Sequence, residues 1–244
     1  MIGIISAMRE EINALLDQLQ DVSKINKGKR TYYSGILFGK KVVLVFSRWG
    51  KVAAAATTTQ LINDYEIDEI IFTGVAGSIS PDLNIGDIVI GRNLFQHDMD
   101  ASPLFKKFEI PIIKKTFIET NINSHLIDST YLFLKNYNHY IDNSLANSFK
   151  ISTPKVVHGD IASGDQFIST MGKVKQLNEE IPTAICVEME GAAVAQICYE
   201  YDLPFSIIRI ISDKADDNSS MDFPLFASKV ASKYPLGILK NYFT

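Results

Sequence analysis

Two apolar runs that end in carboxylates constrain most strongly what this chain can fold into. Residues 184–187 read Ala-Ile-Cys-Val and are followed by Glu188 and Glu190, and the run 205–211 is followed after one residue by Asp213. Short apolar runs of this kind indicate buried strands, and acids behind them are costly unless the protein uses them. Open α/β sheets bind ligands at the carboxyl ends of their strands, so we expect these acids to line one cleft.

The other apolar runs predict strands and helices that alternate over most of the length. Strands are expected over residues 2–5, 30–37, 41–47, 69–73, 87–90 and 156–162, and helices over 9–19, 53–63, 124–134 and 191–199. This alternation is typical of the α/β class, with a mostly parallel or mixed sheet covered by helices on both faces. With 244 residues and no evident linker, the chain is expected to form a single domain over 1–244.

Composition argues against several classes of protein. The net charge is −4 and no basic stripe is present, which argues against nucleic acid or an anionic membrane as a partner. No apolar run approaches the ~20 residues that span a bilayer, and the N-terminus lacks the pattern of a secretory signal. Cys186 and Cys198 lie in apolar runs, which favours buried free thiols over a disulfide. We therefore expect a cytoplasmic protein.

The sequence offers little support for a metal site or a phosphate loop. His97 lies near Asp98 and Asp100, but no second histidine or cysteine stands at ligand spacing, so we expect a hydrogen-bonded structural histidine and no metal. The glycines of 74–77 follow a strand and let a ligand approach the backbone, without the Gly-Lys-Ser/Thr of a phosphate loop. Segment 101–150 shows no recognisable chemistry and is expected to be a surface excursion or an interface.

Seven short motifs, taken together, are more informative than any one of them. In chain order they occupy residues 3–11, 50–53, 73–77, 97–100, 163–167, 187–191 and 209–213. With these motifs the chain resembles the 5′-methylthioadenosine/S-adenosylhomocysteine nucleosidases, within the nucleoside phosphorylase superfamily. The resemblance implies a three-layer α/β/α sandwich around a mixed, partly closed twisted sheet, working as a homodimer without cofactor or metal. It implies hydrolysis of the N-glycosidic bond of methylthioadenosine, S-adenosylhomocysteine and 5′-deoxyadenosine, with release of adenine.

The resemblance also assigns the reacting groups. Glu11 matches the residue that activates the attacking water, and Asp213 matches the acid that protonates N7 of the departing adenine. Glu190 matches the ligand of the ribose hydroxyls, Met189 the ribose contact beside it, and Arg209 a residue near the water and the sugar. These residue types suit the reaction, because protonated adenine leaves as a neutral molecule and carboxylates stabilise the cation that forms on the sugar. An inverting glycosidase likewise uses two separated carboxyl groups.

The same resemblance outlines the pocket around the nucleoside. Phe167 matches the residue that stacks on adenine, although a turn followed by a core phenylalanine explains the same residues equally well. Ile168 matches the backbone that reads the edge of the base. Met8, Trp49 and Phe223 match the pocket for the 5′-alkylthio group.

Four further positions complete the expected substrate contacts. Glu188 and Ser212 lie in two of the seven motifs and are expected to contact the substrate. In the family a partner subunit closes the 5′ pocket, and the candidates here are Ala101 together with Leu104 or Phe105.

Two positions depart from the family pattern. Val75 stands where many members carry serine, so one hydrogen bond near the water or the ribose is expected to be missing. Trp49 replaces a smaller aliphatic residue and is expected to narrow the 5′ pocket toward the methylthio substrate. Other members that carry valine at the position of Val75 accept a wider set of 5′-substituted adenosines, including 6-amino-6-deoxyfutalosine.

Structural interpretations exist for the same residues. Glu11 fits a solvated acid in the first turn of a helix, and Asp213 fits an N-cap or turn acid. Arg209 lies inside an apolar run and should meet a carboxylate, for which Glu190 is one candidate. The methionines and phenylalanines of the pocket fit ordinary core packing.

Other functions compete with this nucleosidase. A purine nucleoside phosphorylase of the same fold would use phosphate as nucleophile and would need cationic or hydroxyl groups that segment 74–77 does not offer. Hydrolysis of 6-amino-6-deoxyfutalosine as the main activity is a second alternative. A non-catalytic nucleoside-binding protein would not need the full set of carboxylates.

Overall fold

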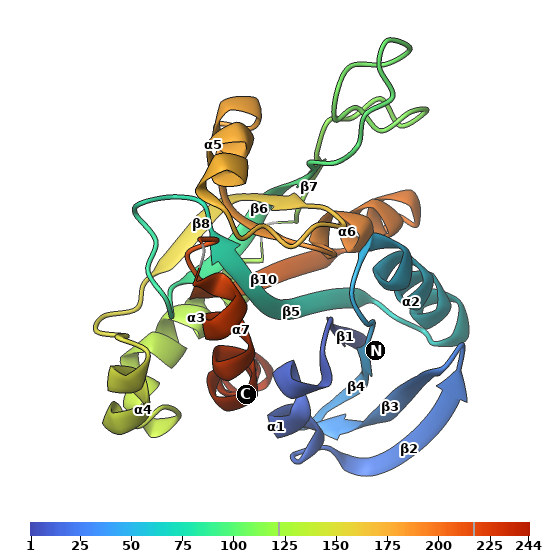
Figure 1. Ribbon diagram of the computed structural model, residues 1–244. Coiled ribbons are helices and arrows are strands. Elements are labelled where there is room, and N and C mark those ends of the chain that lie inside the picture. The colour runs from blue at the N-terminus through green and yellow to red at the C-terminus, as the bar shows by residue number, and fades with distance from the viewer. Residues whose placement is uncertain (122, 217) are drawn as a thin grey trace.

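The computed structural model describes residues 1–121, 123–216 and 218–244 and joins the strands into one ten-stranded mixed sheet (Figure 1). The strands are β1 (Ile2–Ser6), β2 (Gln20–Lys27), β3 (Arg30–Leu37), β4 (Lys40–Phe46), β5 (Glu69–Ser78), β6 (Ile88–Gln96), β7 (Ile118–Glu119), β8 (Val156–Ser163), β9 (Ala184–Glu188) and β10 (Phe205–Asp213). Their order in the sheet is β10-β6-β8-β9-β5-β1-β4-β3-β2, and β7 pairs with β6.

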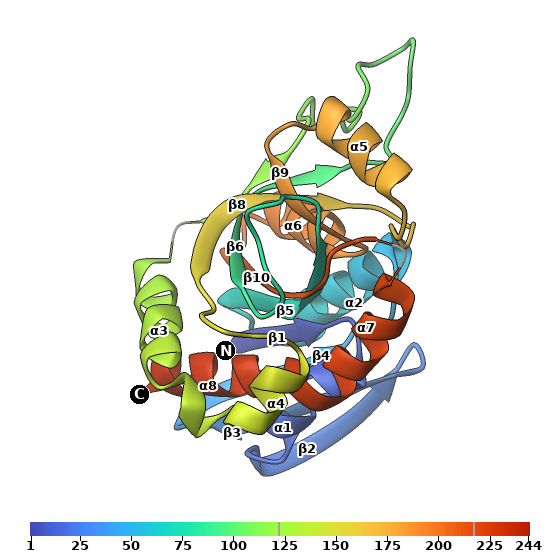
Figure 2. The same ribbon diagram turned by 60° about the vertical axis from the view of Figure 1, so that its left-hand side comes forward.

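Half of this sheet closes on itself. Strand β10 pairs with β6 in antiparallel fashion and also with β5 in parallel, so β5, β10, β6, β8 and β9 form a ring. Figure 2 shows these strands curving around a common axis. The remaining strands, β1 to β4, extend the sheet outward from β5 as an open half. The expected central, mixed and partly closed sheet is therefore confirmed.

Helices cover both faces of the sheet. They are η1 (Arg9–Glu11), α1 (Asn13–Leu16), α2 (Lys51–Asp64), α3 (Ser124–Lys135), η2 (Tyr137–His139), α4 (Asn143–Ser148), α5 (Met171–Glu180), α6 (Gly191–Glu200), α7 (Ser219–Phe226), the π-helical turn η3 (Ala227–Ala231) and α8 (Lys233–Phe243). Neighbouring residues of a strand point to opposite faces. Ile4 of β1 accordingly packs in the cluster that includes Phe133 of α3, and Ile5 packs in the cluster that includes Val194 of α6.

The predicted elements differ from the structure mainly near the N-terminus. The helix expected over 9–19 is a single turn, η1, followed by the short α1, although Ile12, Leu15 and Leu19 are buried as the spacing predicted. Successive tight turns satisfy the same apolar spacing. Strand β2 was not predicted, because all of its residues are exposed and its sequence shows no apolar alternation.

Two strands run further than their apolar cores. Strand β5 continues through the glycines of 74–77 to Ser78, so these glycines lie inside a strand and do not form a turn after it. Strand β6 likewise continues to Gln96. The helices expected at 53–63, 124–134 and 191–199 are confirmed within a few residues.

The segment between β6 and β7, drawn in green, extends away from the sheet at the top of Figure 1. It belongs to the part of the chain expected to be a surface excursion or an interface. Both cysteines are buried and unpaired, as predicted. None of the helices in the described ranges has the length and hydrophobicity needed to cross a membrane.

Candidate active site

One cavity opens where the carboxyl ends of β1, β5, β9 and β10 meet the loops after β4 and β8. Its empty space, open mouth included, is about 630 Å³. Every residue that the resemblance assigned to the reaction or to the same-subunit pocket lines it: Met8, Glu11, Trp49, Val75, Phe167, Ile168, Glu188, Met189, Glu190, Arg209, Ser212, Asp213 and Phe223. The apolar runs that end in acids thus meet in one cleft, as expected.

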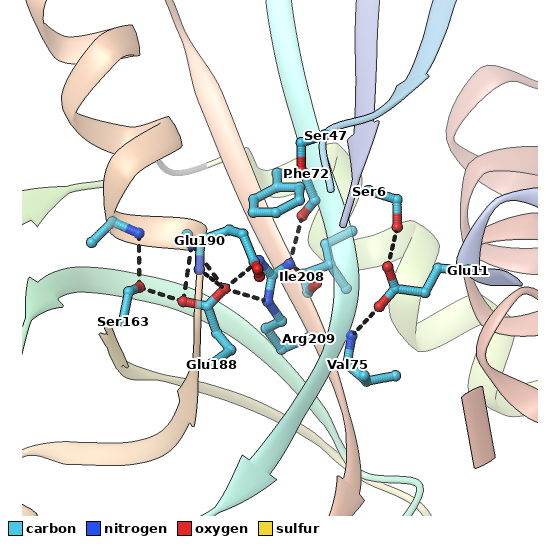
Figure 3. A network of polar contacts seen from close by, with 12 residues as sticks. Ser6, Glu11, Ser47, Phe72, Val75, Ser163, Glu188, Glu190, Ile208 and Arg209 are labelled. Carbon is cyan, nitrogen blue, oxygen red and sulfur yellow. Dashed lines mark hydrogen bonds and ion pairs between the residues drawn. The ribbon is translucent and has the colours of Figure 1, made fainter. Parts of the chain in front are cut away.

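Glu11 is buried in the wall of this cavity with a 2% exposed side chain. Its Oε2 accepts a hydrogen bond from Ser6 Oγ, and its Oε1 accepts one from the N–H of Val75 at 2.9 Å (Figure 3). Oε2 also accepts from the backbone N–H of Met8 at 2.8 Å. Burial raises the pKa of Glu11 above its usual 4.5, against the opposing effect of these donors and of Arg209. The interpretation as a solvated first-turn acid is therefore wrong.

The number of hydrogen bonds to Glu11 shows how many further donors its carboxyl group can accept. An ionised carboxylate has about four acceptor positions, and three are taken by Ser6, Met8 and Val75. The remaining position is on Oε1, at the cavity. A carboxyl group in this setting can bind one further donor, such as a water molecule.

Arg209 meets a carboxylate inside the sheet, as its apolar surroundings required. Its partner is Glu188, with Nη2 donating to Oε2 at 2.7 Å, and both side chains are almost fully buried. The guanidinium carbon also lies 4.1 Å from the centre of the Phe72 ring, in cation–π geometry. The candidate pair with Glu190 was wrong, although Glu190 is only two residues further along the chain.

Glu188 is saturated by hydrogen bonds. Besides Arg209, its oxygens accept from Ser163 Oγ, from the backbone N–H of Glu190 at 3.1 Å and from that of Gly191 at 2.8 and 2.9 Å (Figure 3). Its carboxylate therefore lines the cavity with its acceptor positions already used.

Glu190, unlike Glu188, has most of its acceptor positions free. Its Oε1 accepts one hydrogen bond from the N–H of Gly50 at 2.7 Å, which leaves most of its acceptor capacity for a ligand. Burial, followed by repulsion from Glu188, raises the pKa of Glu190 to about 8, whereas the Gly50 donor and Arg209 act in the other direction. A buried carboxyl group with a raised pKa and a free oxygen in a cavity is typical of a functional site.

Asp213 closes β10 at an irregularity of the sheet. The register between β10 and β5 shifts between Ile211 and Asp213, and such bulges often re-aim a side chain beside an active site. Oδ2 of Asp213 accepts from Ser212 Oγ at 2.8 Å and Oδ1 accepts from the N–H of Ala215 at 2.9 Å. The second bond is that of a turn acid, so the structural interpretation describes part of its environment. The side chain is nevertheless 3% exposed and lines the cavity.

Two glycines of β5 make room for these carboxylates. A Cβ at Gly74 would lie 2.8 Å from Oε1 of Glu11, and a Cβ at Gly77 would lie 2.9 Å from Oδ1 of Asp213. Both distances are too short for a real contact, so any side chain here would displace an acid. The glycines of 74–77 were expected to let a ligand approach the backbone, and the structure shows that two of them let Glu11 and Asp213 approach it.

The mouth of the cavity is aromatic. The Phe167 and Phe223 rings meet edge to face with centroids 5.8 Å apart, and Phe223 meets Trp49 in the same way at 6.1 Å. Phe167 is 42% exposed and Trp49 is 57% exposed, which is unusual for large rings with a purely structural role. Core packing therefore does not explain these two side chains, and an open aromatic face beside polar groups suits a flat heterocycle.

Some residues that were expected at the site lie outside this cavity. Ala101, Leu104 and Phe105 do not line it within the described part of this chain, because they lie in the projecting segment between β6 and β7. The structure also adds polar groups that were not predicted, namely Ser6, Ser163 and the N–H of Gly50. Ser6 and Ser163 each lie at a strand end within a matched motif, but serine at a strand end has no sequence signal of its own.

The charge of the cavity wall is mostly acidic. Among the described residues that line it, Arg209 alone is cationic, and Glu188 already neutralises it. The described side chains form no group of three or more His, Cys, Asp or Glu that is arranged to hold a metal ion. His97 is buried, and its Nε2 has no hydrogen-bond partner among the described residues, although a hydrogen-bonded structural histidine was expected.

Sequence comparison identifies the class of protein that this fold and cavity define. The model of the phosphorylase superfamily matches residues 1–244. The chain therefore belongs to the phosphorylase superfamily.

Individual proteins that are similar to this chain have a narrower activity than the superfamily as a whole. A 5′-methylthioadenosine/S-adenosylhomocysteine nucleosidase of Staphylococcus aureus is 36% identical over 232 residues, which cover 95% of this chain and 94% of that protein. The solved structure of the corresponding nucleosidase of Colwellia psychrerythraea in complex with adenine has a TM-score of 0.85 and 30% identity, covering 98% of this chain and 94% of that one. The futalosine hydrolase structure of Helicobacter pylori has a TM-score of 0.82 and 34% identity, covering 99% and 96%.

Proposed function

We propose that this protein hydrolyses the N-glycosidic bond of 5′-methylthioadenosine and S-adenosylhomocysteine, and also that of 5′-deoxyadenosine, releasing adenine. The observation that supports this most directly is the convergence of Glu11, Glu190 and Asp213 on one cavity. These acids come from the turn after β1, the start of α6 and the end of β10. The activity printed for the S. aureus relative agrees with this arrangement.

In this proposal Asp213 acts on the base. Phe167 stacks on adenine and the backbone at Ile168 reads its edge, so that N7 faces the carboxyl group of Asp213. Protonation of N7 lets adenine leave as a neutral molecule, and the C1′–N9 bond breaks with its electrons passing to the base. The hydrogen bonds from Ser212 and Ala215 fix the orientation of the carboxyl group.

Glu190 and Glu11 act on the sugar. The free oxygen of Glu190 accepts a hydrogen bond from a ribose hydroxyl, and this bond strengthens as positive charge develops on the ring. Glu11 binds a water molecule at its remaining acceptor position and removes a proton as the water attacks C1′. A carboxylate with a raised pKa is a better base for this step than an ordinary one.

Glu188 and Arg209 have a supporting role in this proposal. Because hydrogen bonds saturate Glu188, we assign it to holding Arg209 and the start of α6 instead of the ribose. Arg209 in turn lies close enough to Glu11 and Glu190 to oppose part of the rise that burial causes in the pKa of both carboxyl groups. Met8, Met189 and the aromatic mouth enclose the ribose and the 5′ substituent.

The nature of the nucleophile separates a nucleosidase from a phosphorylase. A phosphate dianion would need a cationic site, and the cationic side chain of the wall is already neutralised. The test is adenine release from 5′-methylthioadenosine in phosphate-free buffer and with added phosphate. Equal rates with free methylthioribose as product support hydrolysis. Adenine release that requires phosphate would overturn it.

A futalosine-type substrate is a second candidate, because the H. pylori futalosine hydrolase covers nearly the whole chain at 34% identity. The base and ribose contacts would be the same, and only the 5′ substituent would differ. Ratios of kcat/KM for methylthioadenosine, S-adenosylhomocysteine and 6-amino-6-deoxyfutalosine decide which substrate is preferred. Trp49 at the 5′ side should favour the smallest of them.

The assembly and setting complete the proposal. We place the active enzyme in the cytoplasm as a homodimer of single-domain chains, in methionine salvage. Large apolar side chains that are more than three-quarters exposed support a dimer: Val52 at the start of α2, and Leu104 and Ile112 in the projecting segment. Ala101 together with Leu104 or Phe105 of a second copy would then reach the 5′ end of the cavity.

A further inference from the structure

Three of the motifs contain charged residues that the reaction does not use, and these residues contact one another. Nζ of Lys51 donates to Oδ1 of Asp98 at 2.6 Å, and Oδ2 of the same Asp98 accepts from the backbone N–H of Asp165 at 2.9 Å. The backbone N–H of Lys51 donates to Oδ1 of Asp165 at 2.7 Å. Lys51, Asp98 and Asp165 thus form a closed triangle, which we call the loop clamp.

The loop clamp joins three separate parts of the fold. Lys51 begins α2, Asp98 follows β6, and Asp165 follows β8, in the loop that carries Phe167 and Ile168 to the cavity. This loop has no regular secondary structure between β8 and α5. Its position therefore depends on contacts of this kind and not on a ladder of backbone hydrogen bonds.

Close packing at two glycines places the loop directly against the segments on both sides of it. A Cβ at Gly50, whose φ is +92°, would lie 2.9 Å from Oδ1 of Asp165. A Cβ at Gly164 would collide with the ring of His97, which precedes Asp98. The loop is held against both neighbouring segments at the residues that surround the clamp.

The clamp also connects the base side of the cavity with the ribose side. Gly50 and Lys51 are consecutive, and their N–H groups donate to Glu190 at 2.7 Å and to Asp165 at 2.7 Å respectively. The amino end of α2, where backbone N–H groups have no partner inside the helix, thus binds two acids at once. One of these acids faces the ribose and the other anchors the loop that stacks on the base.

We infer that Lys51 and Asp98 are positioning residues, which hold the loop of Phe167 and Ile168 in its adenine-binding conformation before substrate arrives. This inference rests on the proposed function. Their side chains are each 17% exposed, so the ion pair is partly shielded from water and resists displacement better than a surface pair. A loop that is already ordered loses less entropy when it closes on a ligand.

The experiment compares Asp98→Ala and Lys51→Met with the wild-type protein. We expect adenine to bind about tenfold more weakly to each variant, because a loop displaced by about 1 Å loses stacking and edge contacts together. The inhibition constant of methylthioribose should stay unchanged, because the side chains of Asp98 and Lys51 do not contact Glu190. Asp98→Asn keeps an acceptor for the N–H of Asp165 and should retain part of the affinity.

A matched control lies at the other end of the same helix. Nζ of Lys27 donates to Asp64 at 2.5 Å near the carboxyl end of α2, so Asp64→Ala removes a similar Lys–Asp pair away from the cavity. It should leave adenine binding unchanged. Fluorescence of Trp49, the single tryptophan of the chain, reports adenine binding and folding in every variant.

The outcomes distinguish a failure of this inference from a failure of the proposed function. A folded Asp98→Ala or Lys51→Met variant with wild-type adenine affinity would overturn the inference while hydrolysis by the wild type stands. Equal losses for adenine and methylthioribose would show a general structural role and would overturn it as well. A wild-type protein that neither binds adenine nor releases it would overturn the proposed function itself.

Discussion

The carboxyl group of Glu11 combines burial with a single free acceptor position, and this combination determines the effect of its substitution. Glu11→Gln keeps the shape and removes the base, and its single amide oxygen keeps the hydrogen bonds on one side of the group, either from the N–H of Val75 or from Ser6 and Met8. We expect a loss of hydrolysis of at least about 10²-fold with the Kd for substrate within a few fold of wild type. Single-turnover rates and equilibrium binding measure the two effects separately. Retained activity would mean that another group activates the water.

The raised pKa of Glu190 makes stability depend on pH in a definite direction. The native carboxyl group, with a pKa of about 8, binds a proton more tightly than in the unfolded chain, where 4.5 is usual. Its stabilising contribution is therefore complete below about pH 4.5 and is lost as the pH rises to about 8, by at most about 1.4 kcal/mol per pH unit.

Replacement of the Glu190 carboxyl group by an amide tests this pH dependence of stability. Glu190→Gln should flatten the fall in unfolding free energy between about pH 5 and 8, because the amide does not titrate and still accepts from Gly50. Urea titrations at several pH values, for both proteins, give the slopes. Identical slopes in wild type and variant would contradict the raised pKa.

How far single residues can be predicted depends on the kind of contact. The need of Arg209 for a carboxylate follows from its apolar run, but its choice of Glu188 over Glu190 depends on how β9 ends and α6 begins, which the sequence does not show. Glu11 was predicted from a family motif only. Its burial depends on Gly74 of a distant strand, and no local pattern near Glu11 indicates that contact.

At the scale of elements, β10 contributes both an acid at its end and a buried cation in its interior. Arg209→Met would leave Glu188 as an uncompensated buried charge, which typically costs about 3–5 kcal/mol. Lys107→Met is the control, because its ion pair with Glu180 has exposed fractions of 41% and 26% and should be worth no more than about 1 kcal/mol.

The double variant makes this prediction specific. Replacing Glu188 by Gln in the Arg209→Met background removes the orphan charge and should recover part of the lost stability. Urea unfolding measures all four proteins. A loss for Arg209→Met no larger than that for Lys107→Met would show that the buried pair is not needed.

Most elements could be predicted because they are amphipathic or wholly apolar. Strand β2 could not be predicted, because all of its residues are exposed and no apolar residue recurs at every second position. The continuation of β5 through 74–77 could not be predicted either, because glycine in the interior of a strand is unfavourable. That continuation is where the structure fits acids against the backbone. The local rule therefore fails at the candidate active site itself.

At the scale of the whole molecule, the partly closed sheet brings acids from the two ends of the chain to one cavity. The alternation of elements predicted the class, but closure of β10 onto both β5 and β6 is a long-range pairing that the family resemblance alone implied. The assembly beyond one chain is a proposal that the exposed apolar residues support.

Charged substitutions at the exposed apolar residues Val52 and Leu104 test whether the protein is a dimer. Val52→Glu with Leu104→Glu should convert a dimer into monomers, because two buried charges would face the interface, and activity should fall if a second copy completes the 5′ pocket. Ile25→Glu is the control, because Ile25 is an exposed apolar residue on β2 at the open edge of the sheet. Sedimentation velocity gives the mass. A wild-type monomer with full activity would contradict the proposal.

The central claim is that separate carboxyl groups meet on one nucleoside, and a crystal structure of Asp213→Asn soaked with 5′-methylthioadenosine tests it most directly. This variant should fold and bind but not turn over, because an amide cannot protonate N7. We expect adenine stacked on Phe167 with N7 at residue 213, a ribose hydroxyl on Glu190, and a water molecule between Glu11 and C1′. An intact nucleoside bound outside this cavity, or one whose base points to Glu11, would contradict the account.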